Sequence, residues 1–218
     1  MVEVQQQKTK TKKEELEAKY GTRYCDFIRL PYYDSVRFAI VDPMHNLFLG
    51  TAKRMIKIWK DLDFLNTNTL KLIQERVDKA SVPSDVGKLP GKIDKFFFDG
   101  FTADELKNWT LLFSLYALKG ILPSEHLECW RLFVIACRYL TNHSITIHDL
   151  DISHPFLVRF CQRFEVLYGK NMVTINMHLH GHLKECVNDY GPIYSFWCFS
   201  FERYNGLLGK YPTNKKNI

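Results

Sequence analysis

Hydrophobic residues recur at every third or fourth position through the middle of the chain, which is the spacing of one face of an α-helix. The most regular stripes lie within residues 102–169. The predicted helices there run from Thr102 to Gly120, from near Ser124 to Cys137, and from near Ser153 to Gly169. The first begins with a capping box, and glycine ends the first and the third. We interpret the stripes as packing faces, so this block is expected to be an all-helical bundle.

A different pattern precedes this block. Residues 36–41 are rich in β-branched and aromatic side chains, which predicts a short buried strand. Asp42 and Pro43 follow directly, and apolar residues then recur at helical spacing as far as Trp59. Aspartate is a good N-cap and proline suits the first helical turn. We therefore expect a strand, an aspartate and a helix in succession.

The remaining segments are less regular. Residues 1–19 are polar and Lys-rich, and we expect a solvated basic arm there. Residues 61–101 are predicted to connect the two blocks, with one helix at about 68–80, a Pro/Gly-rich stretch at 82–91 and an apolar anchor at 96–98. Two short helices are predicted near the other end, at 183–190 and 196–210.

Composition narrows the class of protein without indicating an activity. The chain is 46% hydrophobic and 25% charged, an ordinary globular profile, and its net charge of +6 is compatible with a nucleic-acid partner. Apolar runs fall short of the roughly 18–20 residues that span a bilayer, and no signal peptide is recognised. The six cysteines form no C-x-x-C pair. We expect reduced thiols in a soluble intracellular protein with no membrane partner.

Asp42 and His45 are the first candidates for chemistry. A carboxylate at the end of a buried strand is a frequent metal ligand in α/β sheets. An imidazole three residues later, in the first helical turn, is placed to bond a phosphate or a leaving oxygen. The alternative is that Asp42 is an N-cap and His45 an ordinary residue of the helix start, and the spacing alone favours this alternative.

Three alternating histidines, His178, His180 and His182, share one face if their segment is extended, and Cys186 follows four residues later. Imidazole and thiolate are common ligands of Zn²⁺. A zinc site usually needs a further ligand from a distant segment, and the sequence indicates none. We favour structural histidines over a zinc site.

Glu202 is the third candidate, because it is a carboxylate within a run of aromatic residues, 196–204. A buried carboxylate without a partner is costly or becomes neutral. Its partner is either a basic group such as Arg203 or a divalent metal ion, and the residues alone leave both open. The chain contains no P-loop, no dinucleotide fingerprint and no serine nucleophile elbow.

Two long sequence motifs and several short ones occur along the chain. The long motifs are DPMHNLFLGTAK at 42–53 and FWCFSFERYNG at 196–206, and the short motifs are, in chain order, NWT at 108–110, KGILP at 119–123, NMHLH at 176–180 and YGP at 190–192. Together they resemble the transposases of the CACTA (En/Spm-type) superfamily of DNA transposons. The resemblance covers nearly everything from Tyr20 to Asn214, and the two long motifs are the part that is specific to this superfamily.

The resemblance implies a mixed, predominantly α fold in which a partial RNase H-like α/β core is interrupted by an all-helical insertion. Residues 20–60 and 171–218 would be core segments, 61–101 the connector and 102–170 the insertion. It also implies a D-D-E site that binds Mg²⁺ for two-metal phosphoryl transfer on transposon-end DNA in the nucleus. Glu202 matches the third carboxylate, and Asp42 and His45 match a D-x-x-H signature. The residues expected to contact DNA are Lys53, Arg54, Arg203 and Lys210.

The first two aspartates of such a triad have no match here and are expected upstream of residue 1. One glutamate alone binds Mg²⁺ weakly, so the chain by itself is expected to be inactive. The alternative is a non-enzymatic helical interaction or DNA-binding protein derived from a transposase. A homo-oligomer is a further expected partner.

Overall fold

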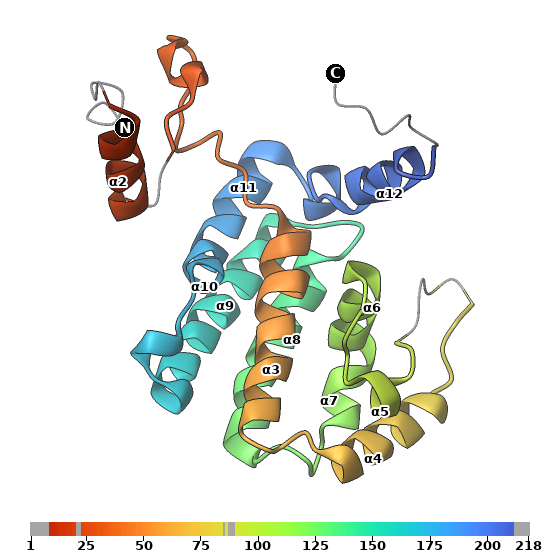
Figure 1. The fold of residues 1–218 in the computed structure, drawn as a ribbon. Coiled ribbons are helices and arrows are strands. Elements are labelled where there is room, and N and C mark those ends of the chain that lie inside the picture. Colours follow the sequence, from red (N-terminus) through yellow and green to blue (C-terminus); the bar gives the residue numbers. More distant parts are fainter. Residues whose placement is uncertain (1–8, 21–22, 85, 87–89, 212–218) are drawn as a thin grey trace. The chain divides into compact units, whose positions relative to one another are not determined.

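The computed structural model describes residues 9–20, 23–84, 86 and 90–211 (Figure 1). Within these residues all regular secondary structure is helical, so the predominantly α prediction is confirmed, and no strand of an α/β core is present among them. No described helix is long and apolar enough to cross a membrane. The chain divides into two compact units, residues 1–40 and 41–218, and every candidate residue lies in the second.

The first unit contains two helical elements. Helix α2 (Lys10–Tyr20) has no buried residue, so the described part of the predicted solvated arm is a solvated helix. A short 3₁₀ helix, η1 (Asp26–Arg29), follows. The Tyr33 ring contacts Phe27 and Phe38, at centroid distances of 5.8 and 5.5 Å.

The strand predicted at 36–41 is wrong. Residues 35–38 form turns, and Val36 is 85% exposed. The reason is local: the Asp34 carboxylate accepts hydrogen bonds from the backbone N–H groups of Val36 and Arg37, at 2.9 and 3.0 Å. A side chain that bonds its own backbone in this way offers the segment a turn in place of a strand.

The second unit begins with the predicted helix that follows Asp42. It consists of a π-helical segment, η2 (Met44–Ala52), which continues directly into α3 (Lys53–Asp61). Its apolar face is fully buried, and Trp59 packs edge-on against Trp130 at a centroid distance of 5.2 Å. The Trp59 indole also donates a hydrogen bond to the Tyr168 hydroxyl at 3.1 Å.

The connector and the first predicted helix of the bundle follow. Their elements are α4 (Thr67–Asp78), α5 (Ile93–Phe96), α6 (Ala103–Asn108), η3 (Trp109–Phe113, π-helical) and α7 (Ser114–Ala117). The predicted capping box of Thr102 and Glu105 is present. Phe98 is buried against the Trp109 ring and Phe97 is half-buried against the core, whereas Phe96 is 59% exposed, so two of the three predicted anchor residues pack.

Helices α8 (Ser124–Leu140) and α9 (Ile147–Tyr168) pack along each other and form the centre of the core. The Phe133 ring of α8 lies 5.0 Å from the Phe160 ring of α9. Helix α9 begins six residues before the predicted start, because Thr146 forms a capping box with Asp149. As predicted, it ends at Gly169, whose φ is +91°.

The rest of the unit is a series of short helices. They are η4 (Lys170–Met172), α10 (Ile175–Leu179), η5 (His180–His182), α11 (Leu183–Tyr190), η6 (Ile193–Ser195) and α12 (Phe199–Leu208). The two helices predicted here are confirmed as α11 and α12. The histidine-containing segment is helical and not extended. Figure 1 shows α12 as the last labelled helix of the unit.

Candidate functional site

The Asp42 carboxylate connects the start of the η2 helix to the segment that precedes α12 through hydrogen bonds. Its Oδ1 accepts hydrogen bonds from the backbone N–H of Met44 at 3.2 Å and of Cys198 at 2.9 Å. Its Oδ2 accepts the backbone N–H of His45 at 3.0 Å. Asp42 is therefore an N-cap, as the spacing predicted, and it also joins residues 156 positions apart.

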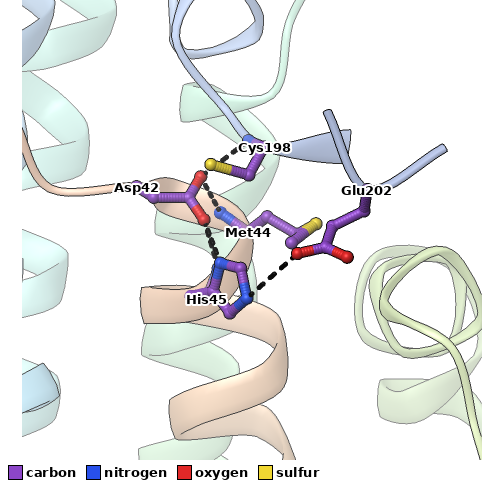
Figure 2. A network of polar contacts seen from close by, with 5 residues as sticks. All are labelled: Asp42, Met44, His45, Cys198 and Glu202. Carbon is purple, nitrogen blue, oxygen red and sulfur yellow. Dashed lines mark hydrogen bonds and ion pairs between the residues drawn. The ribbon is translucent and has the colours of Figure 1, made fainter. Parts of the chain in front are cut away.

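The same carboxylate orients the His45 ring. Oδ2 of Asp42 lies 2.5 Å from Nδ1 of His45, so this nitrogen bonds the carboxylate and Nε2 points away from it (Figure 2). Nε2 faces Glu202, whose Oε1 is 3.9 Å away. Both side chains are about half exposed, 53% for His45 and 57% for Glu202. The two candidates that the sequence placed at opposite ends of the chain thus meet.

Glu202 lies in the first turn of α12, where the helix dipole favours a negative charge. The charge is placed by this short helix and not by packing, because α12 has no buried residue. Phe199, in the same turn, is half-buried against Phe48 and Trp197, with ring centroids 6.4 and 4.8 Å apart. These aromatic contacts and the Asp42–Cys198 hydrogen bond hold α12 beside His45.

His45 and Glu202 line a cleft of about 690 Å³, which we call the Glu202 cleft. Its lining is Met44, His45, Leu49, Thr102, Ala103, Asp104, Lys107, Trp197, Phe199, Ser200, Glu202 and Arg203. Lys107 pairs with Asp104 at 2.7 Å, and its ammonium lies 5.1 Å from the Phe199 ring centroid. The cleft therefore carries two cations, Lys107 and Arg203, and two carboxylates, Asp104 and Glu202.

Electrostatics fix the protonation of the Asp42 cluster. Burial raises the pKa of Asp42, but hydrogen bonds from the His45 ring and from the backbone N–H groups of His45, Cys198 and Met44 outweigh it, and the net pKa is lowered. Burial, with the nearby charges of Asp42 and Glu202, raises the pKa of the Cys198 thiol. Asp42 is thus a carboxylate and Cys198 a thiol at neutral pH.

Asp42, His45 and Cys198 are the one group of three or more metal-ligand side chains brought together within the described residues. The hydrogen bonds of Asp42 occupy both of its oxygens, and the raised pKa of Cys198 disfavours the thiolate that binds metals. This donor set is therefore poorly suited to a metal ion. Asp42 acts as an orienting group. The groups that remain exposed at the cleft are His45 Nε2 and the Glu202 carboxylate.

The π-helical segment η2 is held by the NMHLH motif at 176–180. Sequence reasoning did not connect these two segments. Asn46 donates a hydrogen bond to the carbonyl of Asn176 at 2.9 Å. A Cβ on Gly50 would lie 2.1 Å from Nδ2 of Asn176 and 2.7 Å from the carbonyl oxygen of His45. Glycine is thus required where α10 meets η2. The positions of the two motifs in the sequence did not predict this contact.

The three histidines of the zinc hypothesis do not converge. His178 and His182 lie one helical turn apart, with ring centroids at 5.3 Å, and both are exposed. His180 is buried, and its Nε2 lies 3.1 Å from Thr51 Oγ1. Burial lowers the pKa of His180 to about 3, so it is neutral. Cys186 is also buried.

The predicted DNA contacts lie in different surroundings. Lys53 and Lys210 are exposed, and Arg203 lines the Glu202 cleft. Arg54 is half-buried, and its Nη2 donates a hydrogen bond to the carbonyl of Met172 at 3.1 Å. Sequence reasoning missed Lys107 as a residue of the cleft, and no signal in its surroundings pointed to it.

All six cysteines are free thiols, as predicted. In comparisons with protein-family models, curated proteins and solved structures, the chain matches none of them.

Proposed function

We propose that this chain is part of the catalytic domain of a cut-and-paste DNA transposase and that the Glu202 cleft faces the DNA. One observation carries the proposal: His45 and Glu202 line one cleft. They come from the two long sequence motifs, at 42–53 and 196–206. Arg203 supplies positive charge for a phosphate beside these two residues, whereas the charge of Lys107 is paired with Asp104. Because the substrate would be transposon DNA, the proposal includes the nucleus as the place of action, which a fluorescent fusion would check.

Each residue has a distinct role in this proposal. Asp42 is a positioning residue, because it fixes the helix start, the His45 ring and the Cys198 backbone together. His45 presents Nε2 to the cleft. Because Nδ1 bonds the Asp42 carboxylate, Nε2 donates a hydrogen bond to a phosphate oxygen when the ring carries both protons. Glu202 presents an exposed carboxylate beside His45 Nε2. An RNase H-like core is part of the proposal, and its strands and two aspartates have to come from a further segment or chain.

The Mg²⁺ ions implied by the resemblance fit the described residues only in part. Mg²⁺ prefers an octahedral set of carboxylate, phosphate and water oxygens. Glu202 offers one carboxylate, whereas the oxygens of Asp42 accept hydrogen bonds and Asp104 pairs with Lys107. These residues do not form a two-metal site. We therefore assign no step to Mg²⁺ and expect the chain by itself to bind DNA without cutting it.

Duplex DNA binding at several salt concentrations tests the proposal. A phosphate-binding surface gives a linear fall of log affinity with log salt, with a slope of about −0.9 per phosphate contact. We expect Arg203→Gln to make this slope less steep, and Lys71→Gln, a change of the same charge on α4, to leave it unchanged. Binding without salt dependence would overturn DNA as the partner. Mg²⁺-dependent nicking that Glu202→Gln abolishes would overturn the incomplete metal site.

A second candidate is a non-enzymatic interaction protein, and the surface of α12 favours it. Phe201, Tyr204 and Leu208 are 64%, 65% and 66% exposed and share one face of this helix. Exposed apolar patches are typical of protein contacts. Light scattering over a range of concentrations distinguishes the candidates. A self-association that Tyr204→Ser abolishes, with no salt-dependent DNA binding, supports this second function.

A further inference from the structure

A second hollow, separate from the Glu202 cleft, follows the surface of α3. Its volume is about 490 Å³, and we call it the lysine groove. Its lining is Leu49, Gly50, Lys53, Arg54, Ile56, Lys57, Lys60, Asp61, Phe97, Phe98 and Asp99. Four of these side chains are cationic and two are anionic, so the groove is positively charged.

The lysines form one stripe on the helix. Lys53, Lys57 and Lys60 follow the i, i+4, i+7 spacing, so they lie along one face with neighbours about 5–6 Å apart at Cβ. All three are exposed, and among the described residues none of them has an ion-pair partner. Arg54 adds a charge whose position is fixed by its hydrogen bond to Met172. Such a row of unpaired cations suits a polymer with regularly spaced anions.

Two aromatic residues also line the groove. Phe98 is buried, and the half-buried Phe97 lies under the Lys60 ammonium, which is 4.1 Å from the ring centroid. Lysines beside an aromatic wall are the combination found in grooves that bind single-stranded nucleic acid. A base that stacks on Phe97 would release Lys60 toward a phosphate.

The two hollows are neighbours. Leu49 lines both of them, and it lies one turn after His45 and one turn before Lys53 on the same continuous helix. A strand that occupies the lysine groove can therefore reach the Glu202 cleft by passing Leu49.

We infer that the lysine groove binds the backbone of a single DNA strand and leads it to the Glu202 cleft. The choice of DNA over RNA rests on the proposed function. The groove itself favours a single strand: a cavity of this size holds a drug-sized molecule, which corresponds to one or two nucleotides and not to a duplex. Insertion of α3 into a major groove is disfavoured, because residues 97–99 flank the face that carries the lysines.

The test is a binding titration of a fluorescent oligothymidylate of about 15 nucleotides with the whole chain, followed by anisotropy between 50 and 200 mM salt. The variant is K53Q/K57Q/K60Q. Each lost phosphate contact removes about 0.7 from the salt slope of a single strand, so we expect a slope smaller by about 2 and affinity lower by roughly tenfold or more at 50 mM salt. The three lysines have no ion-pair partners, so the thermal midpoint should fall only slightly, through loss of the Lys60 contact with the Phe97 ring.

The matched control is K71Q/K119Q/K170Q, which removes the same charge from exposed lysines that do not line the groove. It should bind the strand nearly as the unmodified chain does. If both triple variants lose the same affinity, the effect is one of net charge and the inference is overturned. It is also overturned if duplex DNA of the same length competes as well as the single strand.

Arg203→Gln separates this inference from the proposed function. If it weakens duplex binding while K53Q/K57Q/K60Q has no effect on the single strand, the groove inference fails and the proposed function stands. If only K53Q/K57Q/K60Q weakens binding, the groove is supported and the cleft loses its DNA contact. Preference for an RNA oligonucleotide over the DNA strand would overturn the choice of DNA.

Discussion

The two halves of the Glu202 cleft are built differently. The helix of η2 and α3 carries His45 and buries residues along most of its length, whereas α12 carries Glu202 and buries none. Packing fixes the first half. The second depends on the Asp42–Cys198 hydrogen bond and a few half-buried rings. The comparison teaches that two side chains can meet at one cleft when only one of them lies on a rigid element.

The largest difference is expected from truncation on each helix. Trp59→Ala removes a fully buried ring and the hydrogen bond to Tyr168, so the free energy of unfolding should fall by about 3–5 kcal/mol. Leu208→Ala on α12 removes a side chain that is 66% exposed and should change it by less than about 0.5 kcal/mol. Urea denaturation measures both. Equal losses would show that α12 is part of the core.

Glycine substitutions should have opposite signs in the two helices. Gly50→Ala places a Cβ against Asn176 and the His45 carbonyl, and should destabilise the chain by about 1–3 kcal/mol. Gly206→Ala meets nothing within 4 Å in α12 and should stabilise it by about 0.4–1 kcal/mol. Thermal unfolding of the two variants is the measurement. A stable Gly50→Ala chain would contradict the close contact between η2 and α10.

Removal of the Asp42 carboxylate tests what holds α12. Asp42→Ala loses an N-cap and the acceptor for Cys198, so we expect a loss of about 1–2 kcal/mol and faster amide exchange in α12. Asn66→Ala is the matched control, because it removes the N-cap of α4 at a comparable cost and makes no contact with α12. If both variants leave α12 exchange unchanged, the Asp42 bond does not position Glu202.

The smallest effect is expected from pH. The pKa of Asp42 is lower in the folded chain than its ordinary value of about 3.9, so its stabilisation is fully present above that value and is lost as the pH falls through the folded pKa. The free energy of unfolding should therefore fall less steeply below about pH 4 in Asp42→Asn than in the unmodified chain. Parallel pH profiles would mean that Asp42 is not specially stabilised as a carboxylate.

Local signals predicted most of the helices. The capping box at Thr102, the cap at Asp42 and the glycine at 169 all have the predicted roles, because they act through neighbouring backbone groups. The strand at 36–41 was wrong because the Asp34 turn outweighed β-propensity. Helix α9 starts earlier than predicted because its capping box lies at Thr146 and Asp149, a local signal that the prediction did not use.

The site was less predictable than the fold. Sequence pointed to Asp42, His45 and Glu202 one at a time, but their meeting depends on tertiary contacts across the whole unit. The contact of Gly50 with Asn176 and the place of Lys107 in the cleft have no local signature. The alternating histidines show the converse, since a pattern with period two is helical here and sends His180 into the core.

The tryptophans give this chain a built-in optical reporter. Of its four indoles, Trp59, Trp109 and Trp130 are fully buried, and Trp197 alone is half-buried, in the wall of the Glu202 cleft. A collisional quencher such as iodide will therefore reach the emission of this one indole first. Its quenching measures how open the cleft is, and shielding by an added oligonucleotide would be visible without any label.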